Sequence, residues 1–160
     1  MTAISPPVRH TISTEYEVRV ARDPNEFAAI VAIREQVFRD EQGIVDVVVT
    51  DSDDRSSVHV YVVIDDVVAA IGRLTPPTRK RPEGQIAWVA TLPDFRRRGA
   101  AAAVMAALLQ VADNHHFPSV LLSAQTHALP FYALFGFAPY GNRFEVRGIE
   151  HQYMERNPPR

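Results

Sequence analysis

The chain has 160 residues, of which 46% are hydrophobic and 22% charged, a composition typical of a single globular domain. Its net charge is −2 and it contains no cysteine. These values exclude disulfides, thiolate zinc sites and cysteine nucleophiles, and they argue against a nucleic-acid-binding protein, which is normally basic overall. Apolar runs are too short to span a bilayer, so we expect no membrane contact and a cytoplasmic location.

Residues 1–14 are expected to form a flexible arm, and residues 15–157 a single domain. Alternating or β-branched apolar residues predict strands, and apolar residues at helical spacing predict helices. In chain order we expect a strand at 16–21, a helix from 24 to about 40, a strand pair at 58–64 and 67–74, a strand at 85–92, a helix to about 115, a strand at 119–124, a short helix at 129–135 and strand pieces at 137–140, 144–147 and 151–154. This order predicts a mixed sheet with helices packed on it.

Local signals sharpen three of these elements. Asp23 before Pro24 predicts a helix start, because Asp caps a helix and Pro fits its first turn. The pair Asp65-Asp66 between two apolar runs predicts a hairpin turn. Arg34 interrupts the apolar stripe of the first helix, so its charge either reaches solvent on its long stem or faces a functional pocket. A solvated loop is expected for the acidic residues that follow, Asp46, Asp51, Asp53 and Asp54.

The stretch PDFRRRG, residues 93–99, joins a predicted strand to a predicted helix. The first amides of a helix lack intrahelical partners and the helix dipole is positive there, so this joint is a candidate phosphate site. Gly99 lets the backbone approach an anion, and the three arginines add charge, although not all three side chains can face one anion. A solvated basic turn is the alternative interpretation.

Two motifs in this region resemble a known family. Arg96-x-x-Gly99-x-Ala101 resembles the Q/R-x-x-G-x-G/A signature of the GNAT superfamily of acyl-CoA-dependent N-acetyltransferases, and Tyr132-x-x-x-Gly136-Phe137 resembles its Y-x-x-x-G-F pattern. Within the superfamily the chain is similar to the ElaA and YjcF group, with Glu150 in place of a proline. The stretches that carry this similarity are IREQVFRDEQGI (33–44), SAQTHALPFYALFGFAPYG (123–141) and GIEHQYMER (148–156).

The resemblance covers about residues 16–156 and implies an α/β (α+β) GNAT fold. That fold has a mixed, mostly antiparallel sheet of six to seven strands, splayed at an acyl-CoA cleft and flanked by about four helices. The resemblance also implies acetyl-CoA as co-substrate, bound by backbone groups of the strand before the arginines and by the amides of residues 97–102. The cofactor-binding residues that it implies are Val89, Ala90, Thr91, Arg96, Arg97, Arg98, Gly99, Ala100, Ala101, Ala102, Gln125 and Phe131.

Acetyl transfer to an amine needs a base, a group that stabilises the oxyanion and a proton for the departing thiolate. The resemblance implies Tyr132 as general acid, where the alternative is a core aromatic. His151 is the candidate base because imidazole titrates near physiological pH, and an idle strand histidine is the alternative. A strand amide near residues 89–91 would meet the oxyanion. The residues expected to bind the acceptor are Arg34, Phe38, Glu41, Gln42, Arg73 and His127, whose charges would suit an amine that carries a carboxylate.

Three functions compete. The first is acetyl transfer from acetyl-CoA to a primary amine of a small molecule, by direct attack in a ternary complex. The second has a protein lysine or N-terminus as acceptor, and the third is a non-catalytic acyl-CoA-binding domain. A homodimer is possible. The six histidines have no compact ligand spacing and no cysteines accompany them, so we expect no metal.

Overall fold

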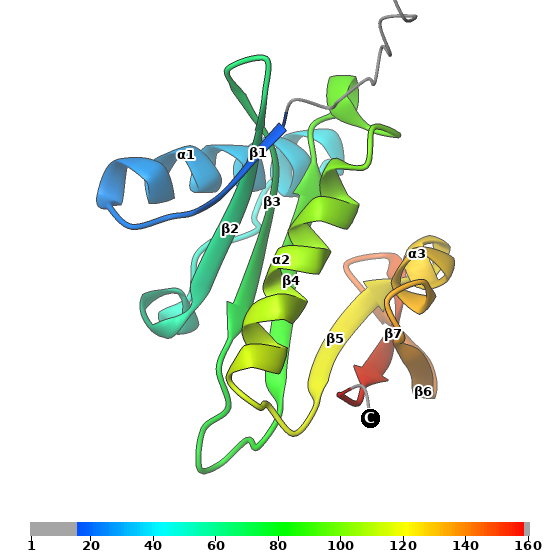
Figure 1. Ribbon diagram of the computed structural model, residues 1–160. Coiled ribbons are helices and arrows are strands. Elements are labelled where there is room, and N and C mark those ends of the chain that lie inside the picture. Colours follow the sequence, from blue (N-terminus) through cyan, green and yellow to red (C-terminus); the bar gives the residue numbers. More distant parts are fainter. Residues whose placement is uncertain (1–15, 159–160) are drawn as a thin grey trace, which may run out of the picture.

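The computed structural model describes residues 16–158 and contains one seven-stranded sheet with the strand order β1-β2-β3-β4-β5-β7-β6 (Figure 1). The strands are β1 (Tyr16–Val20), β2 (Val58–Ile64), β3 (Val67–Thr75), β4 (Gly84–Thr91), β5 (Val120–Gln125), β6 (Ala138–Val146) and β7 (Ile149–Arg156). The helices are α1 (Pro24–Arg34), α2 (Ala100–Asn114) and α3 (Leu129–Ala133). The predicted α/β class and sheet are confirmed, with three α-helices rather than about four. The predicted arm lies outside the described residues.

The helix α1 begins where the sequence predicts. The Asp23 carboxylate accepts a hydrogen bond of 2.8 Å from the Glu26 amide, and Pro24 occupies the first turn. After Arg34 the chain continues as a π-helical segment, Glu35–Glu41, so the helical track ends near the predicted residue 40 but with wider winding. π-Helical turns often occur at functional sites, and this one carries Phe38 and Glu41 toward the centre of the sheet.

The strands β2 and β3 form the predicted hairpin. Its two turn residues, Asp65 and Asp66, have φ angles of 50° and 61°. A tight turn between right-twisted strands needs positive φ at both positions, which Asp tolerates better than most residues. The predicted pieces at 137–140 and 144–147 belong to one strand, β6, whose pairing with β7 shifts between Tyr140 and Phe144.

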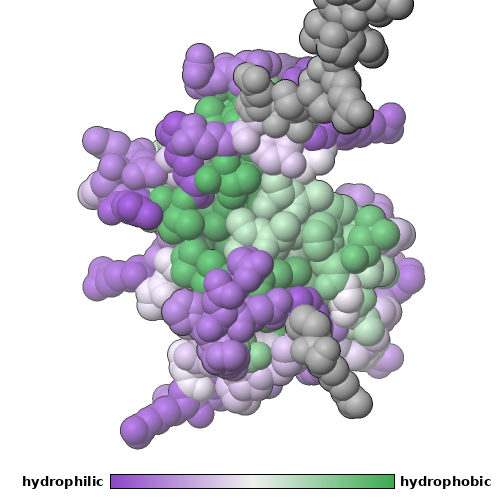
Figure 2. All heavy atoms as spheres, in the orientation of Figure 1, coloured by the Kyte–Doolittle hydropathy of each residue, from purple (hydrophilic) through white to green (hydrophobic). Residues whose placement is uncertain are grey.

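Helices cover both faces of the N-terminal half of the sheet (Figure 1). On one face, α2 packs its buried Val104, Met105 and Leu108 against β2, β3 and β4. On the other face, α1 packs Ile30 and Ile33 against β3 and β4. Figure 2 shows an apolar band across the face that carries α2, bordered by hydrophilic side chains.

Gly72 in β3 explains how closely α2 approaches the sheet. A Cβ atom at Gly72 would lie 2.5 Å from Val104 Cγ1 and 3.0 Å from Leu108 Cδ1, which is closer than van der Waals contact permits. The missing side chain therefore lets α2 rest directly on the backbone of β3. This contact fixes the helix that begins at the predicted phosphate-binding joint.

Candidate active site

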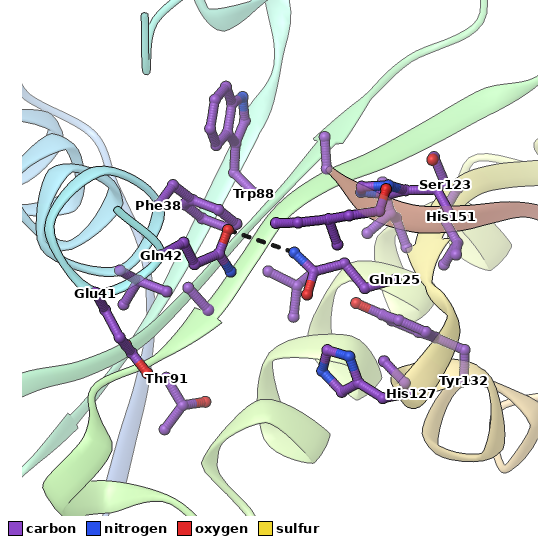
Figure 3. A pocket seen from close by; sticks show the side chains of 18 of the residues that line it. Phe38, Glu41, Gln42, Trp88, Thr91, Ser123, Gln125, His127, Tyr132 and His151 are labelled. Carbon is purple, nitrogen blue, oxygen red and sulfur yellow. Dashed lines mark hydrogen bonds between the residues drawn. The ribbon is translucent and has the colours of Figure 1, made fainter. Parts of the chain in front are cut away.

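A cleft opens where β4 and β5 separate. The two strands are parallel and pair only at Gly84 with Val120 and Gln85 with Leu121, after which they diverge. A cavity of about 710 Å³ lies between them, closed by the π-helical segment on one side and by β7 on the other (Figure 3). The predicted splay of the sheet is therefore present. The predicted site residues that line this cavity are Phe38, Glu41, Gln42, Val89, Ala90, Thr91, Arg96, Gln125, His127, Tyr132 and His151.

A bulge in β4 shapes one wall of the cavity. Ile71 pairs with Ala90 and Arg73 with Ala87, so Gly72 faces two residues, Trp88 and Val89. Trp88 takes a left-handed backbone conformation with φ 57°. Bulges are frequent next to active sites because they re-aim side chains, and this one brings Trp88 into the cavity wall. Sequence reasoning missed Trp88; the available signal was the chain's only tryptophan, four residues before the end of a predicted cleft strand.

Beyond Gln85, no described strand pairs with the edge of β4 that faces β5, although the Thr91 carbonyl on that edge is bound by Arg96. The Leu92 amide donates to Ala69 O of β3 at 2.8 Å, so the backbone groups of the preceding Thr91 point to the opposite edge. Arg96 Nε donates to Thr91 O at 3.1 Å, which agrees with that direction. An extended ligand in the cleft could use this edge as a further strand would.

Arg96 lines the cavity and is paired with Glu41. Its two terminal nitrogens donate to Glu41 Oε1 and Oε2, both at 2.6 Å, and this bidentate hydrogen bond raises the pKa of Arg96 above its ordinary value. The pair joins the end of β4 to the end of the π-helical segment. The two side chains are 44% and 35% exposed, so an incoming anion can reach the guanidinium.

The start of α2 lies beside Arg96. Gly99 is the N-cap with φ 79°, a conformation that favours glycine, and no described side chain caps the helix there. No described atom lies within 4 Å of the position that a Cβ of Gly99 would take. The amides of Ala100, Ala101 and Ala102 have no backbone acceptor among the described residues, as the first amides of a helix usually do not, and are therefore available to an anion.

The three arginines of the joint diverge, as expected. Arg96 lines the cavity, whereas Arg98 lies over the Phe95 ring at 5.5 Å and 3.9 Å from Asp65. Arg97 is exposed and has φ 65°. Arg97, Arg98 and residues 99–102 do not line the cavity itself but form the turn next to it.

One ring nitrogen of His151 is hydrogen-bonded within the protein, which fixes the orientation of the imidazole. Its Nδ1 lies 2.8 Å from Ile149 O, and because a carbonyl oxygen only accepts, Nδ1 carries the proton in this contact. Phe144 stacks on the imidazole at 5.8 Å between ring centroids. In the neutral ring, Nε2 therefore keeps a free lone pair, as a general base requires.

Tyr132 lines the cavity from α3. Burial raises the pKa of its hydroxyl to about 12, so the group stays protonated at neutral pH and can donate a hydrogen bond. Phe131 packs edge-on against Tyr132 and Phe135, at 5.1 and 5.3 Å, within the core. Phe131 does not line the cavity, and its expected contact with the cofactor stays a prediction.

Neutral amides cross the middle of the cavity. Gln125 Nε2 donates to Gln42 Oε1 at 3.5 Å, the contact drawn in Figure 3. Farther along, Arg147 in the β6–β7 turn bonds Asp46 in the loop after the π-helical segment. With Arg96 and Glu41, these contacts tie residues 41–46 to the other elements around the cleft.

Arg34 and Arg73 do not line the cavity, which corrects the prediction that they bind the acceptor. Arg34 is fully buried and donates to Asp54 Oδ1 at 3.0 Å and Val49 O at 2.9 Å. Arg73 donates to Asp51 at 2.7 Å and Asp54 at 2.9 Å. Buried charges require partners, and here these carboxylates supply them.

Asp54 is the centre of this buried cluster, so the expectation of a solvated side chain is wrong for it. Only 9% of its side chain is exposed, whereas Asp46 is 81% exposed. Burial alone would raise the pKa of the Asp54 carboxyl, but hydrogen bonds from the Asp51 amide, Arg73 and Arg34 outweigh burial and hold the pKa below its usual range. This cluster neutralises both arginines within the protein.

Across residues 16–158, no group of three or more potential metal ligands is present. Within the same residues, no helix has the length and apolar character needed to cross a membrane.

The fold and this cleft define a class of protein. Residues 51–158 match the profile of the GNAT acetyltransferase domain, and the chain therefore belongs to the GNAT family of acetyltransferases. A UPF0039 protein of Synechocystis is 35% identical over 134 residues, which is 81% of this chain and 86% of that protein.

Two solved structures have the same architecture. An acyl-CoA N-acyltransferase from Pseudomonas aeruginosa has a TM-score of 0.78 and 25% identity, over 89% of this chain and 98% of that one. Escherichia coli ElaA has a TM-score of 0.75 and 26% identity, over 89% and 99% of the two chains. The resemblance inferred from the sequence motifs is thus confirmed, and the protein is an acyltransferase of the kind that uses acyl-CoA.

The described residues fit such a co-substrate. The uncapped start of α2 beside Arg96 suits a diphosphate, and the edge of β4 that does not pair with β5 suits the amide groups of a pantetheine arm. Thioester chemistry would then lie in the part of the cavity that Tyr132 and His151 line.

Proposed function

We propose that this protein transfers the acetyl group of acetyl-CoA to a primary amine of a small molecule, by direct attack within a ternary complex. One observation carries the proposal: the part of β4 that does not pair with β5, a protonated tyrosine hydroxyl and a histidine with a free Nε2 all line one cavity. These are the backbone groups, the acid and the base that the reaction needs. A cytoplasmic location and a homodimer remain predictions from the sequence.

In the proposed reaction the amine nitrogen attacks the thioester carbonyl carbon, a carbon–nitrogen bond forms and the carbon–sulfur bond breaks. His151 Nε2 takes the proton that the nitrogen loses. Tyr132 donates its phenolic proton to the departing sulfur, which leaves as the thiol. The proton held by His151 then passes to solvent and Tyr132 takes one back, so that both side chains return to their starting protonation states. A backbone amide at the bulge, Trp88 or Val89, is our candidate donor to the oxyanion, because a bulge frees amides from the β3 ladder.

A small acceptor is favoured over a polypeptide by the contacts across the cleft. The pairs Arg96–Glu41, Gln125–Gln42 and Arg147–Asp46 tie the end of the π-helical segment and the loop after it to the turn after β4, to β5 and to the β6–β7 turn. The first two pairs lie at the cavity itself, and a polypeptide acceptor would have to displace them.

The experiment is a calorimetric titration with acetyl-CoA, followed by an assay of thiol release with amines. We expect saturable binding to the wild type and none to Gly99→Glu, because glutamate places negative charge at the start of α2. Gly141→Glu is the matched control, since Gly141 also has positive φ, 71°, and open space around it but lies in β6. Absence of binding to the wild type, or equal loss in both variants, contradicts the proposed site.

A further inference from the structure

The acceptor side of the cavity carries almost no unpaired charge. Among the lining residues that the structure describes, Arg96 is the only arginine or lysine and Glu41 the only carboxylate, and they bind each other. The other polar side chains are neutral amides, hydroxyls and two histidines. A substrate carboxylate that enters the cavity could therefore bind Arg96 only in competition with Glu41 and, under the proposed function, with the diphosphate of the co-substrate.

The two arginines that could have supplied that cation are shielded. Arg34 lies behind Trp88, with its guanidinium carbon 5.0 Å from the centroid of the indole ring. Trp88 lines the cavity, whereas Arg34 is fully buried and does not. Both guanidiniums of the cluster are bound by Asp54. The cluster thus supports the indole without exposing a positive charge.

An aromatic wall faces the remaining space. Phe38 and Trp88 are in edge-to-face contact with 5.2 Å between ring centroids, and both line the cavity with Val37, Leu122 and Ile149 (Figure 3). Arg34 on one side of the indole and Phe38 against it fix the orientation of this wall. Rigid aromatic walls bind planar apolar groups through apolar burial and favourable ring–ring geometry.

We propose that the acceptor is a primary amine whose remaining part is apolar and aromatic, without a carboxylate, and that this part packs against Phe38 and Trp88. This inference rests on the proposed function and specifies its substrate class. It replaces the expectation of a carboxylate-bearing amine, because the arginines on which that expectation depended are neutralised elsewhere. The Gln42–Gln125 pair, at 3.5 Å, can open to bind a neutral polar group.

The test compares kcat/KM, calculated per unprotonated amine, for pairs of amines at saturating acetyl-CoA. L-Phenylalaninamide and L-phenylalanine differ in a neutral amide against a carboxylate, and we expect the amide to be preferred on the order of 100-fold, because an unpaired carboxylate is costly to desolvate. 2-Phenylethylamine and hexylamine differ in the ring, and we expect the aromatic amine to be preferred about three- to tenfold.

Two variants assign these preferences to the named residues. Trp88→Leu should reduce the aromatic-to-aliphatic ratio toward one, with acetyl-CoA binding by calorimetry as the check that the site is intact. Gln42→Arg should raise kcat/KM for L-phenylalanine relative to its amide by about tenfold or more, because it adds the missing cation.

The outcomes separate the two proposals. If acetyl-CoA does not bind, the proposed function fails. If acetyl-CoA binds and L-phenylalanine is used as well as its amide, the proposed function stands and the substrate class is overturned. If acetyl-CoA binds and no amine of the panel is acetylated, both the substrate class and the proposed transfer to a small amine are overturned, and only the cofactor site stands.

Discussion

The two halves of the sheet use charged and aromatic side chains differently. In β1–β4, both faces are covered by helices, and the charges of Arg34, Arg73 and Asp54 are paired in the interior. In β5–β7, most of β6 is exposed, and the rings of Tyr140, Phe144 and Tyr153 stack at the surface. The halves meet through two parallel residue pairs, and the cleft begins where this pairing stops. Charged groups therefore stabilise the first half, while in the second half a histidine and a tyrosine remain available for chemistry.

The largest expected effect is a loss of activity when His151, in the β5–β7 half of the sheet, is replaced. His151→Ala should lower kcat by about 10²- to 10⁴-fold, the usual contribution of a general base, with acetyl-CoA affinity unchanged. The measurements are thiol release and calorimetry. His115→Ala, at the exposed end of α2, is the control and should retain activity. An active His151→Ala enzyme would remove the assigned base.

The next largest effect is a loss of stability when Asp54, in the buried charge cluster of the β1–β4 half of the sheet, is replaced. Asp54→Ala should lower the free energy of unfolding by about 3–5 kcal/mol, because it leaves two buried guanidiniums without this carboxylate. Urea unfolding measures the change. Asp53→Ala, whose side chain is 44% exposed and 4.0 Å from Arg81, should cost less than about 0.5 kcal/mol. Similar losses of unfolding free energy in both variants would show that the buried carboxylate of Asp54 stabilises the fold no more than the exposed carboxylate of Asp53 does.

A smaller loss of stability is expected where α2 contacts the sheet. Gly72→Ala should cost about 1–3 kcal/mol, because its Cβ would overlap Val104. In a double-mutant cycle, Val104→Ala should relieve part of that cost by removing the overlapping methyl groups. Strictly additive unfolding energies would show that the two residues do not share this contact.

Removing the charge that pairs with Arg96 is expected to increase the affinity for acetyl-CoA rather than reduce it. Glu41→Gln should tighten acetyl-CoA binding by about two- to fivefold, because an exposed ion pair of about 0.5–1 kcal/mol no longer competes with the diphosphate for Arg96. Glu35→Gln is the control, since Glu35 pairs with Arg39 and not with Arg96. Weaker binding to Glu41→Gln would show that Glu41 positions Arg96 for the ligand instead.

The pH dependence of stability distinguishes two buried groups. His59 Nε2 donates to Asp54 O at 2.8 Å, and burial, with the nearby Arg34 charge, lowers the pKa of His59 below 6.5. The unfolded chain then binds the proton first, so stability falls as pH drops below about 6.5. The lowered pKa of Asp54 removes further stability only below about pH 4. Urea unfolding from pH 7 to 5 should show the first slope, and His59→Gln should flatten it; an unchanged slope would exclude His59.

Local signals in the sequence were sufficient for most of the fold. The Asp23-Pro24 helix start, the Asp65-Asp66 turn and the strand at the cleft depend on neighbouring residues, so they were readable without the tertiary structure. The arginine–glycine joint was readable for the same reason, since the left-handed φ of Gly99 is a local requirement. Tyr132 and His151 were found through motif resemblance, and both line the cavity.

The features that the sequence did not predict depend on contacts between residues that are distant in the chain. The sequence by itself identified Arg34 as a charge that needed a partner, but only the folded chain brings Asp54, twenty positions farther along, to it. The same holds for Arg96 with Glu41, and for the extra residue in β4 that turns Trp88 into the cavity wall. Helix starts, turns and apolar periodicity act over a few residues and are written in the sequence locally. Strand register and the pairing of buried charges depend on which distant segments meet, and the tertiary structure alone determines that.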